Sequence, residues 1–217
     1  MKPPLTVDLL CTEANLFAQI ESQQSDPNLY GVTDGKAVGT YFEVKFQKYL
    51  REKYIYTTGN AAKGMDFPDL LVDMKVTSRK QPQSSCPFRA ARQKIFGLGY
   101  SLLVFVYDKT DNSITQTSRL DVRNVIFVDQ ARTADFQTTM GIHKIIENAG
   151  NIDDLVAFMQ ERYLPIDDIQ AYQLAEEILN NPPQIGYLTI SNALQWRLQY
   201  QRVIDSAGNI NGILRIF

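Results

Sequence analysis

The sequence predicts an α/β (α+β) protein in which helices flank a mixed central sheet, followed by a mostly helical C-terminal elaboration. Residues 72–77 alternate apolar and polar side chains, which is typical of a strand with one buried face. Residues 101–107 form a short apolar run, as expected for a strand that is buried on both faces. Between residues 38 and 50 the apolar side chains recur at helical spacing.

In the first half of the chain, periodicity and capping residues define the expected elements. An amphipathic helix is predicted from Val7 to Ile20, and Thr33 or Asp34 caps a second helix. A short strand is expected at Tyr54–Thr58, and a helix that begins with proline at Pro87–Phe96. The stripe of the second helix consists of Val38, Phe42, Phe46, Tyr49 and Leu50.

The second half reads as strands followed by helices. The expected strands are Ile114–Leu120 and Val125–Val128; the expected helices are 151–163, 167–179 and a last one from Thr189 or Ser191 to about Val203. A hairpin or strand closes the chain at 205–217, with a turn at Gly208-Asn209. This order resembles a small winged-helix module. We expect this module to serve in packing or dimerisation more than in contacts to DNA bases. We expect a core at residues 1–164 and a helical C-terminal subdomain at 165–217.

The strand at residues 72–77 carries the chemistry. It presents Asp73 and Lys75 on one face, a few residues after another acid, Asp66. Mg²⁺ prefers oxygen ligands and keeps several waters, so two carboxylates could hold it against a phosphodiester. The pattern alone is weak evidence, because Asp34-x-Lys36 also occurs and a charged pair is often just a solvated surface.

The surrounding elements resemble the PD-(D/E)xK nuclease superfamily, which has an αβββαβ core and includes most type II restriction endonucleases. The local pattern is most similar to MutH-like endonucleases. Gly39 and Glu43 match the preceding helix, Asp66 begins the Asp-Phe segment, and Asp73-x-Lys75 follows seven residues later. The resemblance covers residues 36–107. It implies Asp66 and Asp73 as metal ligands, Lys75 as the catalytic lysine and Glu43 as a helper acid.

One ambiguity concerns the first acid. The literal Pro-Asp pair is Pro68-Asp69, which makes Asp69 the alternative to Asp66. Only three residues separate Asp69 from Asp73, which leaves little room for a hairpin. The spacing from Asp66 accommodates a tight turn around Pro68-Asp69, so Asp66 is preferred.

Composition excludes several classes of protein. The chain has 217 residues, enough to bury a sizeable core, and no apolar run approaches the ~20 residues of a membrane span. We recognise no secretory signal and expect a cytoplasmic protein whose two cysteines are reduced. One histidine, His143, and two cysteines cannot form a usual zinc site.

The net charge is −2, but the charges are unevenly distributed. No Asp or Glu occurs between residues 74 and 107, where several basic side chains lie beside the proposed acids. Such a patch suits DNA phosphates, although a solvated surface explains it equally well. Arg, Lys and Gln also suit base edges. The candidate DNA-binding residues are Arg79, Lys80, Gln81, Gln83, Arg89, Arg92, Arg197 and Arg202.

Together these patterns predict a Mg²⁺-dependent, sequence-specific endonuclease for double-stranded DNA, of the type II restriction kind. A homodimer is expected, because a palindromic site calls for two-fold symmetry. Direct attack by water would leave a 5′-phosphate. The alternatives are a MutH-like nicking repair enzyme, a junction- or RNA-directed nuclease on the same fold, and a non-catalytic DNA-binding regulator or α/β domain.

Overall fold

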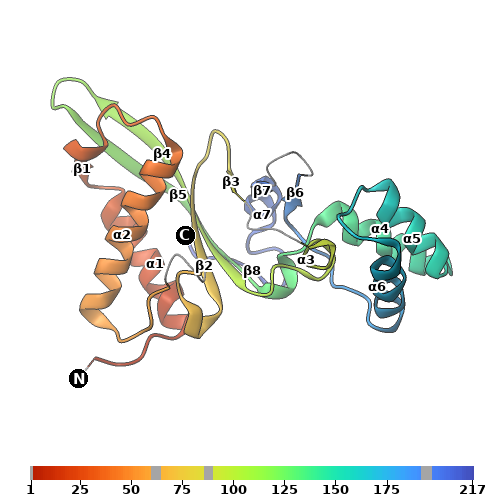
Figure 1. The fold of residues 1–217 in the computed structure, drawn as a ribbon. Coiled ribbons are helices and arrows are strands. Elements are labelled where there is room, and N and C mark those ends of the chain that lie inside the picture. Colours follow the sequence, from red (N-terminus) through yellow and green to blue (C-terminus); the bar gives the residue numbers. More distant parts are fainter. Residues whose placement is uncertain (1, 60–64, 86–89, 192–196) are drawn as a thin grey trace.

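The computed structural model describes residues 2–59, 65–85, 90–191 and 197–217. Helices α1 (Val7–Glu21) and α2 (Gly35–Lys53) cover one face of a central sheet. A small second sheet and a short helix cover part of the other face, and a cluster of helices lies at the far end (Figure 1). The predicted mixed sheet flanked by helices is therefore confirmed.

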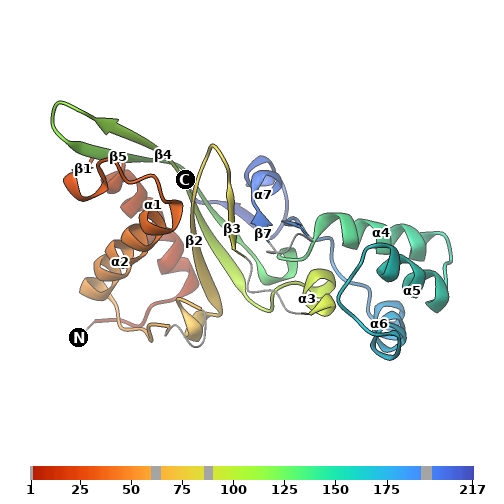
Figure 2. The same cartoon turned by 45° about the horizontal axis from the view of Figure 1, so that its top comes forward.

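The central sheet is built on a long antiparallel hairpin of β4 (Ser101–Asn112) and β5 (Thr117–Val128), whose tip extends past β1 (Figures 1 and 2). Strand β2 (Val72–Ser78) pairs with β4 in parallel and forms one edge. On the other side of β5 lie β1 (Ser25–Asp26) and β8 (Ile213–Arg215), both antiparallel to it. The sheet is thus mixed, with β2 as one of its edge strands.

The apolar run predicted for residues 101–107 forms a strand that is buried on both faces. Phe105 packs against Phe42 and Phe46 of α2, with ring centroids 4.9 and 5.3 Å apart. Val104 and Val106 point to the opposite face and join the core under the second sheet. A strand that contributes to two cores is held firmly in register, because a slip by one residue would exchange its faces.

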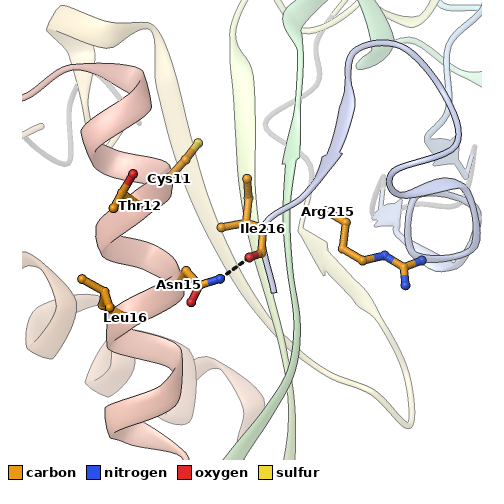
Figure 3. A pocket seen from close by; sticks show the side chains of 6 residues that line it. All are labelled: Cys11, Thr12, Asn15, Leu16, Arg215 and Ile216. Carbon is orange, nitrogen blue, oxygen red and sulfur yellow. Dashed lines mark hydrogen bonds between the residues drawn. The ribbon is translucent and has the colours of Figure 1, made fainter.

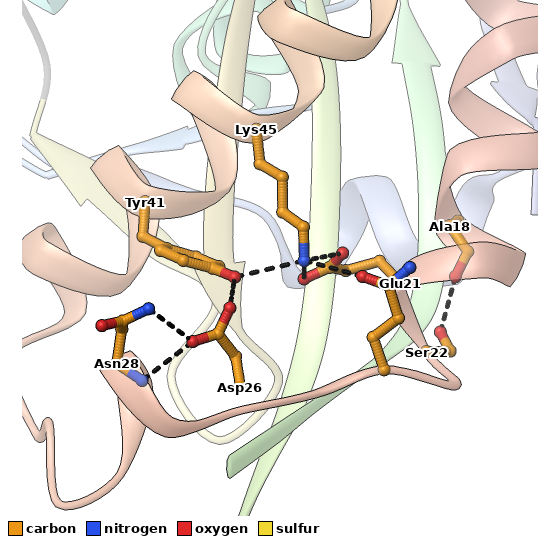
Figure 4. A network of polar contacts seen from close by, with 8 residues as sticks. Ala18, Glu21, Ser22, Asp26, Asn28, Tyr41 and Lys45 are labelled. Carbon is orange, nitrogen blue, oxygen red and sulfur yellow. Dashed lines mark hydrogen bonds and ion pairs between the residues drawn. The ribbon is translucent and has the colours of Figure 1, made fainter. Parts of the chain in front are cut away.

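Two polar clusters fasten α2 to the segment before it. In the first, Lys45 Nζ donates to Glu21, Gln24 and Tyr41, and the Tyr41 hydroxyl donates to Asp26 (Figure 4). Asp26 in turn accepts the backbone N–H of Asn28 at 2.8 Å, at the start of the short helix η1 (Pro27–Leu29).

The second cluster surrounds the buried carboxylate of Glu13 on α1. Tyr49 and Tyr54 donate their hydroxyls to it at 2.6 and 2.7 Å, and Lys53 Nζ lies 2.6 Å away. Elsewhere on α1, Asn15 donates to the carbonyl of Ile216, the residue that follows β8. This hydrogen bond crosses a pocket between α1 and the C-terminal segment (Figure 3).

The second sheet has the strand order β3 (Gln83–Ser85), β7 (Arg197–Gln199) and β6 (Thr189–Ile190). The helix predicted from Thr189 or Ser191 to about Val203 is therefore wrong where the structure describes it; residues 192–196 lie outside the described ranges. Only α7 (Gln201–Ser206) is helical. Leu198 and Tyr200 are buried around an exposed Gln199, which is the period of a strand.

The helical cluster contains α3 (Ala91–Phe96), α4 (Phe136–Glu147), α5 (Ile152–Glu161) and α6 (Asp168–Asn180). Helix α4 was not predicted, and His143 lies inside it. Helix α6 packs with α4 and α5, whereas β6, β7, α7 and β8 pack on the central sheet. The described elements after residue 180 are thus three short strands and the short helix α7.

Two strand predictions need correction. At Tyr54–Thr58 the structure has only a single bridge between Ile55 and Pro4. Residues 113–116 form the turn of the β4–β5 hairpin, where Asn112 accepts the N–H of Ile114 at 2.9 Å, so Ile114 is not in a strand. Among the described residues, no helix is both long and apolar enough to cross a membrane.

Candidate active site

Strand β2 places Asp73 and Lys75 on the face of the sheet that α1 and α2 do not cover. Val72 and Met74 alternate with them and are buried in the core beneath those helices. Asp73 is in register with Leu102 of β4, and Lys75 with Val104. The predicted alternation is therefore present, and the apolar neighbour strand holds both charged side chains in place.

A tight turn brings Asp66 beside this strand. The backbones of Phe67 and Val72 exchange hydrogen bonds of 3.0 and 3.2 Å around the short helix η2 (Pro68–Leu70). Leu71 closes the turn with a left-handed φ of +52°. As a result, Asp66 Oδ2 accepts the backbone N–H of Met74 at 2.9 Å.

The alternative acid, Asp69, lies on the other side of this turn. It is exposed, and its Oδ2 accepts the backbone N–H of Thr57 at 3.0 Å. The geometry thus groups Asp66, and not Asp69, with Asp73.

Helix α2 passes close to β2. Gly39 is buried there, and a Cβ at this position would lie 3.8 Å from the backbone oxygen of Val76. One turn later Glu43 feels the charges of Asp66, Asp73 and Lys75. One turn further, Gln47 donates its side-chain amide to Asp66 Oδ1 at 3.2 Å. Gln47 was not a predicted site residue, although its spacing of four from Glu43 puts both on one helical face.

Several acids lie close together in this cluster, and burial disfavours their charged forms. Lys75 Nζ lies 2.6 Å from Asp73 Oδ2, and the Asp73 side chain is only 3% exposed. Burial raises the pKa of Asp73 to about 6; Lys75 opposes this rise and Asp66 adds to it. Burial also raises the pKa of Glu43 to about 7, with Asp66 and Asp73 adding to the rise and Lys75 opposing it. Such crowding of acids favours a cation.

The donor set fits a hard cation that retains water. Asp73 Oδ2 is buried and accepts no hydrogen bond of good geometry in the described structure, its close contact being the ion pair with Lys75. No group of three His, Cys, Asp or Glu side chains within the described ranges is arranged to hold a metal. A site with two carboxylates, completed by water and a substrate phosphate, matches the coordination habits of Mg²⁺.

Five of the candidate DNA-binding residues lie where β2 leaves the central sheet and the second sheet begins. Lys80 and Gln81 are exposed in the turn between β2 and β3. Arg79, at the start of this turn, pairs with Asp108 at 2.9 Å. Gln83 lies in β3 and Arg197 in the neighbouring β7.

The other three candidates do not join this group. Arg92 on α3 pairs with Glu177 of the helical cluster. The guanidinium of Arg202 on α7 stacks over the ring of Phe136, 3.7 Å from its centroid, which leaves it only partly exposed. Arg89 lies outside the described residues.

Comparisons with known proteins agree along almost the whole chain. The family model described as type II restriction enzyme NspV matches residues 4–215. The type II restriction enzyme NspV of Nostoc sp. (strain ATCC 29411 / PCC 7524) is 62% identical over 213 residues, which cover 98% of this chain and 97% of the relative. No solved structure matches the chain significantly.

Proposed function

This chain belongs to the family of the type II restriction enzyme NspV, and on that premise we propose that it is a Mg²⁺-dependent endonuclease that cuts double-stranded DNA at a specific sequence. The observation that supports a hydrolytic site is the grouping of Asp66, Asp73, Lys75 and Glu43 at the edge strand β2. We assign this group to the PD-(D/E)xK kind, with a MutH-like arrangement of the acids.

Asp66 and Asp73 would hold the metal. They lie on adjoining segments, and the buried Asp73 Oδ2, whose close contact is Lys75 Nζ at 2.6 Å, would gain the metal as a further partner. When bound, Mg²⁺ lowers the pKa of a coordinated water and offsets the negative charge that builds up on the phosphate. Waters and a phosphate oxygen would complete its shell.

Lys75 would position the attacking water or the phosphate, and Glu43 would exchange a proton nearby. Lys75 places a cation next to Asp73, where it can hold the water or a phosphate oxygen in position. Glu43, with its pKa raised to about 7, can hold or release a proton near neutral pH. Attack by water on phosphorus with departure of the 3′ oxygen leaves a 5′-phosphate on one fragment.

We further propose that two copies act together on one DNA site. Each copy contributes one cluster of acids, so cutting both strands at a single encounter calls for two copies related by a two-fold axis. The turn between β2 and β3, with Arg79, Lys80 and Gln81, is the proposed contact to DNA, together with Gln83 and Arg197 of the second sheet.

Two rival functions remain distinguishable. A MutH-like repair enzyme would use the same four residues but would nick one strand. A DNA-binding regulator would need neither Mg²⁺ nor Asp73. Burial and the charge of Asp66 raise the pKa of both Asp73 and Glu43, and this supports the nuclease, because a regulator gains nothing from such an arrangement.

The test is cleavage of unmethylated phage DNA with Mg²⁺ by the wild type and by Asp73→Ala, Lys75→Ala and Asp69→Ala. Discrete fragments should appear and should be lost in the first two variants, by a factor of at least about 10², while Asp69→Ala still cuts. Nicked DNA alone would favour the repair enzyme. DNA binding without cleavage in all four proteins would overturn the proposal in favour of the regulator. Sedimentation of the DNA complex measures the number of copies.

A further inference from the structure

Gln47 lies in the interior of α2, with its side chain against the acidic cluster. Its amide nitrogen is 3.2 Å from Asp66 Oδ1, and the side chain is partly buried. The backbone of this residue is held as well, because Tyr56 donates its hydroxyl to the Gln47 carbonyl at 2.9 Å. The ring of Tyr56 packs on Phe67, the neighbour of Asp66, with centroids 5.6 Å apart.

Asp66 is therefore held through both of its carboxylate oxygens. Oδ2 accepts the N–H of Met74 at 2.9 Å, and Oδ1 accepts the amide of Gln47. The final torsion of an aspartate is broad and roughly two-fold, so a single hydrogen bond would leave the plane of the carboxylate loosely defined. Two donors on different elements fix that plane, while each oxygen keeps a second lone-pair site for a cation.

We propose that Gln47 is a positioning residue for the metal site: it holds the Asp66 carboxylate in the orientation that binds the divalent cation. This inference rests on the proposed function, since it takes Asp66 as a ligand. Groups that hydrogen-bond a metal-ligating carboxylate commonly change metal affinity by about 10- to 100-fold when they are removed. An amide suits the role because, unlike a second carboxylate, it donates a hydrogen bond and adds no negative charge.

A structural role for Gln47 makes a different prediction. A side chain that merely packed α2 against the turn would lower stability when altered and leave metal affinity unchanged in the folded protein. The geometry argues against a packing role. The Gln47 side chain makes a polar contact to Asp66, and Asp66 also accepts a hydrogen bond from the backbone of β2.

The experiment measures Mn²⁺ binding by calorimetry without DNA, for the wild type, Gln47→Ala and Gln47→Met. Methionine keeps the length of the side chain but lacks the amide donor, so it carries the test if the alanine variant does not fold. We expect Mn²⁺ affinity to fall about 10-fold or more in Gln47→Met. The Mg²⁺ concentration for half-maximal cleavage should rise by a similar factor, with a smaller change in rate at saturating Mg²⁺.

Two further variants separate the possible failures. Gln19→Ala removes an exposed glutamine of α1 whose amide donates to Asn15, and it should bind Mn²⁺ like the wild type. Asp73→Ala should lose Mn²⁺ binding; if it does not, the proposed site itself is wrong. If Asp73→Ala loses binding while Gln47→Met keeps the wild-type affinity, the site stands and the role of Gln47 is overturned.

Discussion

Two buried carboxylates, those of Asp73 and Glu13, differ in the hydrogen-bond donors around them. Burial raises the pKa of Asp73 to about 6, and the charge of Lys75 offsets only part of that rise. Burial alone would also raise the pKa of Glu13, but hydrogen bonds from Lys53, Tyr49 and Tyr54 outweigh it and lower that pKa below its ordinary value of 4.5. The first carboxylate is suited to gain a cation, whereas the second is already satisfied and links α1 to α2.

Glu13→Gln should therefore destabilise the protein in a pH-dependent way. Because the folded-state pKa of Glu13 is lowered, its contribution is present above pH 4.5 and is lost as the pH falls through the folded-state pKa. Lys53 is partly exposed, so we expect a loss of about 1 kcal/mol at pH 7. Urea unfolding at pH 7 and at acidic pH measures it, with the exposed Glu52→Gln as control. An equal loss at every pH would contradict the assignment.

At the scale of elements, the predictable parts were those with a long and regular pattern. Helix α1 was expected at Val7–Ile20 and spans Val7–Glu21, and α6 begins one residue after its predicted first residue, Asp167. The turn that brings Asp66 beside Asp73 followed from Pro68-Asp69 and the spacing of the acids. Strands β6 and β7 were missed because two or three residues do not establish a period. Gln47 was missed because nothing in the sequence shows that it donates to Asp66.

The turn between β2 and β3 is the element whose proposed role in DNA binding can be tested separately from cleavage. Arg79→Ala/Lys80→Ala should weaken DNA binding and reduce the slope of log affinity against log salt by up to about 2, because each phosphate contact contributes about one. Fluorescence anisotropy over a salt series measures both. Arg119→Ala/Lys144→Ala removes two exposed charges from β5 and α4 as a matched control. Equal slopes in the two double variants would exclude the turn from the DNA interface.

For the whole molecule, the charges are arranged in blocks. Residues 147–180, which include α5 and α6, contain eight acids and one base, Arg162, whereas residues 74–107 contain no acid. By charge alone, we expect DNA phosphates to be repelled by α5 and α6 and attracted to the exposed Arg79 and Lys80 between β2 and β3. Asp135 is one of the residues that join the helical cluster to the second sheet. It caps α4 through the N–H of Thr138 at 2.9 Å and accepts the N–H of Ile190 in β6 at 2.8 Å.

Asp135→Ala should loosen the helical cluster from the second sheet without damaging the acidic cluster. It removes a helix cap and leaves two buried N–H groups without their acceptor, so we expect a loss of about 2–4 kcal/mol. Hydrogen exchange should speed up at Thr138 and Ile190, while Mn²⁺ affinity stays unchanged. Asp129→Ala, which removes the cap of the short helix η3 (Gln130–Arg132) at an exposed position, is the control. A loss no larger than that of the control would show that Asp135 does not join the parts.

The parallel register between β2 and β4 also sets which insertions the chain can tolerate as it diverges. One extra residue inside β2 ahead of Asp73 would turn the rest of the strand over, sending Met74 outward and Asp73 into the core beneath α2. By contrast, the ladder ends at Ser78, so residues 79–82 can be lengthened or exchanged without moving Asp73. On the roles proposed above, a relative could change its target sequence through this turn while the number of residues between Asp66 and Asp73 stays constant.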